Sequence, residues 1–534
     1  MTEVAINRLQ TRMRVPSDAM GEGTRLKRVL AASLARELES AIERRSISVD
    51  GYLCIAKLRA KVVLRLGESD AALAATVAEG IADAISGAIR GASGIYYTSR
   101  AHVLADLVSS AMRADLERSW AWSQLGFWQE REARSARSHA NQAVQALIRE
   151  ARHAVAVISY LARDGSTLHA LLRWVDARLW HELAKAASRA HGLPTDPEQG
   201  LRLETPSRPA FEIAARFVRQ SYLARALSTA RSEALPDQTF AAFAILVMLE
   251  VEPAAICSGS DSVYAVLHSI AMLLLRSLGR GTVVTTISDV PSPASPAAEG
   301  LDLRKDWESE ASIPVGPQML ADRLDPSAAE SAPDTTSPGA TNTRASTRDQ
   351  LDREAAEQPL QEVRKTAVTT AGGLAYLLNV ISRIELPAMV MRDHRLTRLG
   401  LRWTMHQLAV ALLSLEPDDP AALAFAGLLP DAPPPTLGLD PPSDDESAAI
   451  DECRTVVIAY LRQALADRLE PADISDDALI DFVCRRRAKV LGDPGWIEVH
   501  FSIEEASPEI RFAGLDLDPG WIPWLGVVVK FIYA

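Results

Sequence analysis

Serine and aspartate stand shortly before a histidine in the segment CSGSDS and the residues that follow it. Ser258, Ser260 and Asp261 stand shortly before His268 there. A hydrolase holds its serine on a sharp strand-to-helix turn, usually within GxSxG, so that a neighbouring base can activate the oxygen. The segment has neither this form nor a strand pattern before it. We therefore do not predict a catalytic serine at this position.

Metal and phosphate sites follow spacing rules that this chain does not meet. Zinc sites use HExxH or paired CxxC motifs, whereas the histidines are scattered and His181 and His191 belong to no such motif. The glycines of GAIRGASG lack the lysine of a phosphate-binding loop and follow a helical pattern instead of opening one. We expect no metal, no cofactor, no small-molecule substrate and no enzymatic activity.

Charged residues also group near residue 480. Ser475 precedes Asp476 and Asp477, an order typical of a helix N-terminus, where acidic side chains meet the positive end of the helix dipole. The segment CRRRAK (484–489) places cations toward the end of the same helix, where they are favoured. A basic docking patch is the alternative interpretation of CRRRAK.

Basic side chains alternate with apolar ones in two segments, INRLQTRMRV (6–15) and CIAKLRAKVVLRL (54–66). A period of two predicts half-buried strands, here with a basic outer face. Two interpretations stay open, a solvated sheet face and a docking surface for an acidic partner. Nucleic acid is disfavoured, because no aromatic side chains alternate with the cations. The candidate interaction residues are Arg8, Arg12, Arg14, Lys57, Arg59 and Lys61.

Aromatic residues make up only 5% of the chain, so the places where they cluster are informative. Trp120, Trp122 and Trp128 fall in the segment SWAWSQLGFW, where helical spacing puts several aromatic rings on one face. Trp521 and Trp524 flank a proline in GWIPW near the C-terminus. Aromatic packing between helices is the simpler interpretation, and a partner-binding hot spot is the alternative.

The sequence patterns around these residues predict a mainly α-helical fold with small α+β ends. Periodicity predicts helices over 24–42 and 68–92, which form a β-α-β-α unit with the two basic strands, and further helices from about 98 to 280. At the C-terminus, WIEVHFSI and GVVVKFIY predict two strands. We expect these strands to pair antiparallel, because a Pro-Gly turn stands between them.

Composition divides the chain into six parts. Two segments rich in proline and small polar residues cannot bury enough apolar surface to offset chain entropy, so we interpret them as linkers. The parts are an α/β domain with basic-faced strands (1–95), a helical domain (96–282), a long disordered linker (283–362), a helical block (363–428), a Pro/Asp-rich linker (429–447), and a helix with a C-terminal β clasp (448–534).

Charge and hydropathy limit the partners and the location. The net charge of −12 at pH 7 repels nucleic acid on average. The most apolar windows are shorter than the ~18–20 uninterrupted apolar residues of a membrane span, and the N-terminal residues lack the apolar core of a signal peptide. We expect a cytoplasmic protein without a membrane span. We also expect reduced, core-type cysteines, because no CxxC pair occurs among Cys54, Cys257, Cys453 and Cys484.

Four groups of segments together resemble a known family. In chain order they are INRLQTRMRVP with IAKLRAKVVLRLG, then WAWSQLGFW, then TTAGGLAYLLNVI, and finally the long ending from GWIEVHFSI to GVVVKFIY. They are similar to tape-measure and assembly proteins encoded in the gene clusters of contractile injection systems, the phage-tail-like particles of bacteria. The resemblance implies a non-enzymatic structural or assembly role, or one in setting tail length. Tube, baseplate or cap proteins would be the partners.

Two other functions remain open at this point. One is an effector or toxin cargo, whose linkers would let the chain be threaded through a tube. The other is a general scaffold, in which the long linker spaces two protein-binding modules.

Overall fold

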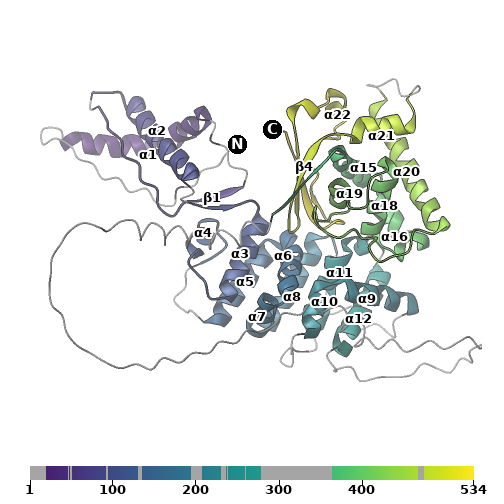
Figure 1. Cartoon of the computed structure of the whole chain (residues 1–534). Coiled ribbons are helices and arrows are strands. Elements are labelled where there is room, and N and C mark those ends of the chain that lie inside the picture. The colour runs from purple at the N-terminus through teal and green to yellow at the C-terminus, as the bar shows by residue number, and fades with distance from the viewer. Residues whose placement is uncertain are drawn as a thin grey trace, which may run out of the picture. The chain divides into compact units, whose positions relative to one another are not determined.

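The structure, a computed structural model, is mainly α-helical, with a short sheet near the N-terminus and a larger sheet near the C-terminus (Figure 1). This architecture confirms the predicted fold class. The first predicted strand, which carries Arg8, Arg12 and Arg14, and the predicted linker 283–362 lie outside the described residues. The described residues are 6, 20–45, 47, 51–65, 67–91, 94–129, 135–193, 207–229, 236, 239–258, 260–277, 364–466 and 474–533.

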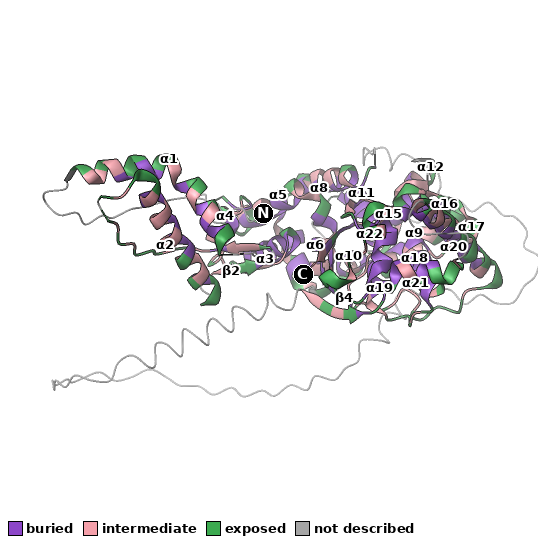
Figure 2. Ribbon diagram, turned by 90° about the horizontal axis from the view of Figure 1, so that it is seen from above, coloured by how far each residue is buried: buried purple, intermediate pink, exposed green. Residues whose placement is uncertain are grey.

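The first two helices, α1 (Met20–Arg44) and α2 (Asp70–Arg90), share a hydrophobic core of their own. Apolar side chains recur every three or four residues on each helix, which produces one buried stripe per helix. Leu30, Leu34 and Leu38 of α1 and Leu73 and Ile81 of α2 belong to this core. Figure 2 shows exposed residues along the other sides of both helices.

The second predicted strand is much shorter than the sequence indicated, and this prediction was wrong in extent. β1 (Tyr52–Cys54) pairs antiparallel with β2 (Ile95–Tyr97). Residues 55–65, by contrast, form no strand with any described residue. Helices cover the apolar side of this segment instead of a sheet, because Leu58 and Leu64 pack against the core of α1 and α2.

A helical body follows β2. Its most apolar helix, α11, is buried along nearly its whole length, as expected of a helix that is hydrophobic on all sides. The helices of the body are α3 (Arg100–Met112), α4 (Ser119–Gln124), α5 (Ala136–Arg149), α6 (Ala151–Asp164), α7 (Ser166–Trp174), α8 (Ala177–Ala190), α9 (Arg208–Gln220), α10 (Tyr222–Thr229), α11 (Thr239–Val251), η3 (Pro253–Ser258) and α12 (Ser260–Ser277).

The C-terminal region combines helices with a sheet whose strand order is β3-β4-β5-β7-β6. The strands are β3 (Lys365–Thr369), β4 (Ala488–Asp493), β5 (Trp496–Phe501), β6 (Gly520–Ile522) and β7 (Val527–Tyr533). The helices are η4 (Gly372–Tyr376), α15 (Leu377–Arg383), α16 (Leu386–Arg392), α17 (His394–Thr397), α18 (Leu401–Leu413), α19 (Pro420–Phe425), α20 (Asp444–Leu465), α21 (Asp476–Cys484), η5 (Ile503–Glu505) and α22 (Pro508–Phe512).

The two predicted C-terminal strands do pair with each other, but they run parallel and not antiparallel. Trp496 of β5 is opposite Val528 of β7, and Phe501 is opposite Tyr533. A parallel pair needs a crossover of about a dozen residues or more, and residues 502–526 supply one that contains η5, α22 and β6. The first three residues of GWIPW form β6, and its Pro523 and Trp524 lie in the turn of the antiparallel hairpin that β6 makes with β7.

Aromatic rings from separate segments meet beside this sheet. Tyr376 of η4 stacks on Phe501 at 5.1 Å between ring centroids and contacts the edge of Phe531 at 5.1 Å. The hydroxyls of Tyr376 and Tyr533 share a hydrogen bond of 2.7 Å. One continuous core contains these rings together with the buried residues of the helical body.

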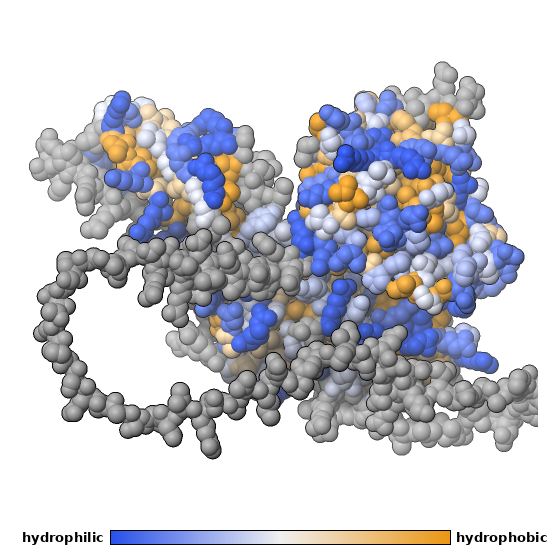
Figure 3. Space-filling model, viewed as in Figure 1, coloured by the Kyte–Doolittle hydropathy of each residue, from blue (hydrophilic) through white to orange (hydrophobic). Residues whose placement is uncertain are grey.

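Hydrophilic side chains separate small apolar patches on the face drawn in Figure 3. Among the described residues, α2 is long and apolar enough to cross a membrane by length and composition, and the bent pair Gly372–Arg383 with Leu386–Arg392 passes the same test. Leu73 and Ile81 of α2 are buried against α1, and Leu377 and Ile381 of α15 lie in the main core. The cysteines are free, and three of them are buried, in agreement with core-type residues.

Candidate functional site

A buried carboxylate lies at the centre of the tryptophan-rich segment. Asp106 stands on the buried helix α3, and its exposed fraction is 7%. Its Oδ2 accepts hydrogen bonds from the Tyr97 hydroxyl at 2.8 Å and from the Trp122 indole N–H at 2.9 Å. Its Oδ1 forms an ion pair with Arg118 at 2.9 Å. The carboxylate of Asp106 is therefore satisfied by three donor groups away from solvent.

A second group of buried charges joins the start of α3 to the C-terminal sheet. The Thr98 hydroxyl donates to Asp493 Oδ2 at 2.8 Å, although 395 positions separate the two residues. Arg364 pairs with Asp493 at 3.4 Å and with Glu498 at 2.7 Å. The Trp496 indole N–H donates to Glu498 at 2.8 Å. We define the polar seam as Tyr97, Thr98, Asp106, Trp122, Arg364, Asp493 and Glu498.

The pKa values of Asp493 and Glu498 are shifted in opposite directions. Burial raises the pKa of Asp493, and the charge of Arg364 only partly opposes this shift. For Glu498, burial also favours the neutral acid, but hydrogen bonds, first among them one from His500, and the charge of Arg364 lower its pKa overall. One carboxylate is thus stabilised as an anion, while its neighbour resists ionisation.

His102 lies against the polar seam as a neutral base. Burial lowers its pKa to about 4, so the ring carries no charge at pH 7. Its Nδ1 lies 3.3 Å from the backbone nitrogen and 3.0 Å from the hydroxyl oxygen of Thr98. The ring meets Tyr97 edge-on at 5.5 Å between centroids.

Glu250, near the end of α11, caps another helix of the body. Its Oε1 accepts from the Ser159 hydroxyl at 2.8 Å and from the backbone N–H of Tyr222 at 2.9 Å. Its Oε2 accepts from the Ser221 hydroxyl and from the backbone N–H of Leu223. Burial raises its pKa, and these hydrogen bonds oppose the shift. Glu250 therefore satisfies the free N–H groups at the start of α10.

Glu252 has the same role for a helix of the C-terminal region. Its Oε2 accepts from the backbone N–H of Leu401, the first residue of α18, at 2.7 Å. Burial raises its pKa, and the charges of Arg216 and Arg402 oppose the shift. Gly400 has a φ of +91°, and a Cβ at this position would clash with Glu252 Oε2. The helical body and the C-terminal region are thus joined here as well as at the polar seam.

A cavity of about 110 Å³ lies between the helical body and the C-terminal region. Ser159 and Glu250 line it from the body, while Arg402 and the turn glycines Gly495 and Gly526 line it from the other side. Arg402 also donates to the backbone carbonyl of Glu250 at 2.9 Å. The volume can hold several water molecules or one small polar molecule. The carboxylate of Glu250 is already saturated with donors and offers a ligand little.

His191, which also lines the cavity, is fixed in one tautomer. Its Nδ1 lies 2.9 Å from the carbonyl oxygen of Pro523, and because a carbonyl only accepts, Nδ1 carries the proton. Its Nε2 is then an acceptor, and it has no partner among the described residues. Burial lowers the pKa of His191 to about 4. The neighbouring Trp521 meets this ring edge-on at 5.0 Å and donates its indole N–H to the carbonyl of Ala190.

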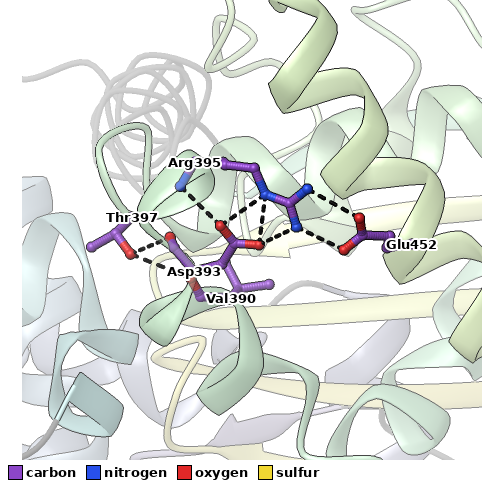
Figure 4. A network of polar contacts seen from close by, with 5 residues as sticks. All are labelled: Val390, Asp393, Arg395, Thr397 and Glu452. Carbon is purple, nitrogen blue, oxygen red and sulfur yellow. Dashed lines mark hydrogen bonds and ion pairs between the residues drawn. The ribbon is translucent and has the colours of Figure 1, made fainter.

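A separate polar network fastens α17 to α20 (Figure 4). Arg395 donates to Asp393, which caps α17, and to Glu452 of α20, with a shortest distance of 2.7 Å to each. The Thr397 hydroxyl donates to the backbone carbonyl of Asp393 at 2.6 Å. The hydrogen bond from Arg395 lowers the pKa of Asp393. Since all three guanidinium nitrogens of Arg395 are used within the protein, this network is an internal anchor.

The structure places the predicted tryptophans mainly in the core. Trp122 is fully buried, and Trp128 meets its ring edge-on at 5.9 Å. Trp120 and Trp524 are partly buried against the same core. Trp521 is half-buried beside His191. These positions agree with aromatic packing between elements, and Trp122 and Trp521 each hold a specific acceptor in addition.

The predicted cations divide into two groups. Lys57, Arg59 and Lys61 are exposed on the segment 55–65, and none of them belongs to the polar seam. In CRRRAK, Arg486 is buried and donates to the backbone carbonyls of Val483 and Glu505. The structure does not bring the two groups into one site.

The remaining predicted groups make local contacts. Ser475 caps α21 through its side chain. Asp476 pairs with Arg462 and Asp477 with Arg454, each at 2.6 Å. Of the candidate serine site, His268 lies part-way along α12, where burial lowers its pKa, and the side chains of Ser260 and Asp261 lie outside the described part of the structure.

Sequence reasoning missed the buried charges. Asp106, Glu250 and Glu252 each stand beside or within an apolar helical run, and a charge in such a position could have been recognised as a buried partner. Asp493 and Arg364 gave no such signal, because their partner Thr98 and the sheet around them come from distant parts of the chain.

These contacts hold segments together; they do not converge on a reacting atom. Within the residues that the structure describes, no group of three or more His, Cys, Asp or Glu side chains could hold a metal ion. The fold is that of a mainly helical protein in which buried polar contacts connect the C-terminal mixed sheet to a helical body. No family model, no curated protein and no solved structure matches this chain.

Proposed function

We propose that this protein is a non-enzymatic assembly factor of a contractile, phage-tail-like injection particle, and that it acts by binding other particle proteins such as tube, baseplate or cap components. The proposal starts from the ordered resemblance of its segments to proteins of such particles. The structure adds a physical reason to take those segments together.

The observation that carries the proposal is that two of the resembling segments meet in one place. The segment TTAGGLAYLLNVI supplies Tyr376, and the resembling C-terminal ending supplies Phe501, Phe531 and Tyr533 to the same aromatic cluster. A Cβ at Gly373 would clash with the carbonyl oxygen of Val483, so the glycine pair of the same segment is needed for this packing. Residues that resemble a family and also depend on one another for packing support a shared fold.

A folded binding body fits the described residues better than an extended ruler. The longest described helix, α1, has 25 residues and therefore spans about 38 Å. Residues 100–277 and 364–533 contribute to one continuous core. An extended rod would have to give up the polar seam and the two glutamate caps. We therefore favour an assembly factor over a protein that fills the tail tube.

Deletion of the gene in the organism that carries it tests the proposal. We expect electron microscopy of purified preparations to show few or no particles, and a plasmid copy of the gene to restore them. A frame-shifted plasmid copy is the control for effects on neighbouring genes. Particles of normal number and length in the deletion strain would contradict the proposal. If such particles failed only to kill or modify target cells, the cargo alternative would be favoured.

A further inference from the structure

Within the described residues, the segment 56–65, which we call the basic strap, is held from one side. Leu58 and Leu64 pack against the core of α1 and α2. Val62 lies over Gly80 of α2, where a Cβ would clash with the valine methyl group. The alternate residues Lys57, Arg59, Lys61 and Arg65 are exposed. The strap is therefore extended, with one apolar side fixed and one basic side open.

The backbone of the basic strap is open as well. Residues 57–64 make no backbone hydrogen bond to any other residue that the structure describes. An extended backbone with free N–H and C=O groups is a template on which another strand can pair.

The cations of the basic strap differ from those of the neighbouring helices. Arg25 and Arg44 of α1, and Arg45 directly after it, are paired with acidic residues of α2. Among described residues, the four cations of the strap have no acidic partner. In a chain with a net charge of −12, this makes the strap a local positive surface.

We propose that the basic strap binds an acidic, extended segment of a partner protein, which adds to it as a β-strand. Backbone hydrogen bonds would supply pairing, and acidic side chains at every second position of the partner would meet Lys57, Arg59 and Lys61. A basic strand would be disfavoured at this place, because like charges directly opposite each other repel. Aromatic side chains do not alternate with the cations, which argues against single-stranded nucleic acid. This inference does not depend on the proposed function.

A binding assay with the full chain and a defined probe tests the proposal. The probe is a fluorescein-labelled peptide of alternating glutamate and valine, and the comparison peptide alternates lysine and valine. We expect only the acidic peptide to bind, with an affinity that falls as salt is raised. The variant R59E/K61E should bind it at least tenfold more weakly. The matched variant K27E/R28E changes two exposed cations of α1 by the same charge and should stay within twofold of wild type.

A proline variant separates strand pairing from charge attraction. Ala60 is exposed on the basic strap, and A60P removes one backbone donor while all four cations remain. We expect A60P to weaken binding of the acidic peptide at least fivefold without changing the melting temperature. The proposal would be overturned if K27E/R28E weakened binding of the acidic peptide as much as R59E/K61E does, or if A60P left that binding unchanged. It would also be overturned if the peptide bound only after residues 1–15 were removed. Tighter binding of single-stranded DNA than of the peptide would overturn it too.

Discussion

Single buried charges carry much of the specificity of this fold. Asp106 holds Tyr97, Trp122 and Arg118 at once, so the tryptophan-rich segment is positioned by a carboxylate as well as by apolar contact. Removing one partner of a buried, hydrogen-bonded ion pair leaves the other charge unsatisfied, which is more costly than never having had the pair.

The variant D106N tests this role. We expect it to lower the free energy of unfolding by about 3–5 kcal/mol, because Arg118 loses its counter-charge and the amide can accept fewer hydrogen bonds. The control is D477N, whose ion pair with Arg454 is at the surface with the carboxylate side chain 84% exposed. D477N should change the free energy of unfolding by no more than about 0.5 kcal/mol. Urea unfolding measures both, and equal effects would contradict a special role for Asp106.

The neutral histidines predict a pH dependence of stability. The pKa of His191 is about 4 in the folded chain against an ordinary value of 6.5, so the unfolded chain binds more protons as the pH falls below about 7. The stabilisation is complete above the unfolded pKa and is lost as the pH falls toward the folded one. Between pH 7 and pH 6, protonation of His191 in the unfolded chain should lower the free energy of unfolding by about 0.7 kcal/mol.

The variant H191Q isolates this contribution. Between pH 7 and pH 6, its free energy of unfolding should fall by about 0.7 kcal/mol less than that of the wild-type chain. Guanidinium or urea unfolding at the two pH values provides the comparison within each protein. An unchanged difference would show that His191 does not stay neutral in the folded chain.

At the scale of elements, close approach of backbones decides how the C-terminal region closes. Gly373 of η4 lies against Val483 and Cys484, with no room for a side chain. G373A should destabilise the protein by about 1–3 kcal/mol, since η4 or α21 must shift. The control, G87A in α2, places its Cβ in open space and should stabilise by up to about 1 kcal/mol. Thermal unfolding followed by circular dichroism distinguishes them, and a neutral G373A would contradict the packing.

Helices were predictable from the sequence because each one carries its own periodic pattern. The stripe of α1 and the serine cap of α21 are local features, and the structure contains both. The strand predicted over 54–66 failed for a different reason. Alternation of apolar and basic residues specifies an extended segment with one buried side, and it does not specify whether a sheet or a pair of helices covers that side.

The direction of β7 beside β5 could not be read from the turn chemistry. The predicted Pro-Gly turn was wrong, because Gly520 is the first residue of β6; the turn lies instead over residues 523–526, so the antiparallel partner of β7 is β6 and β5 takes the parallel position. The polar seam was hidden for a related reason. Thr98 and Asp493, like His191 and Pro523, are brought together only by the tertiary fold.

At the scale of the whole molecule, the helical body and the C-terminal region share one continuous hydrophobic core. The polar seam, the caps from Glu250 and Glu252, and the contacts of Trp521 join the helical body to the C-terminal region through residues distant in sequence. Such a body presents fixed surfaces, which suits a protein that works by being bound.

Particle length separates a folded assembly factor from a ruler. In the deletion strain, a plasmid copy lacking residues 291–350 leaves every described residue in place. If the chain measured tail length as a helical rod, particles would shorten by about 90 Å, at about 1.5 Å for each residue removed. We predict particles of unchanged length by electron microscopy. Shortening in proportion to the deletion would contradict the proposed assembly role.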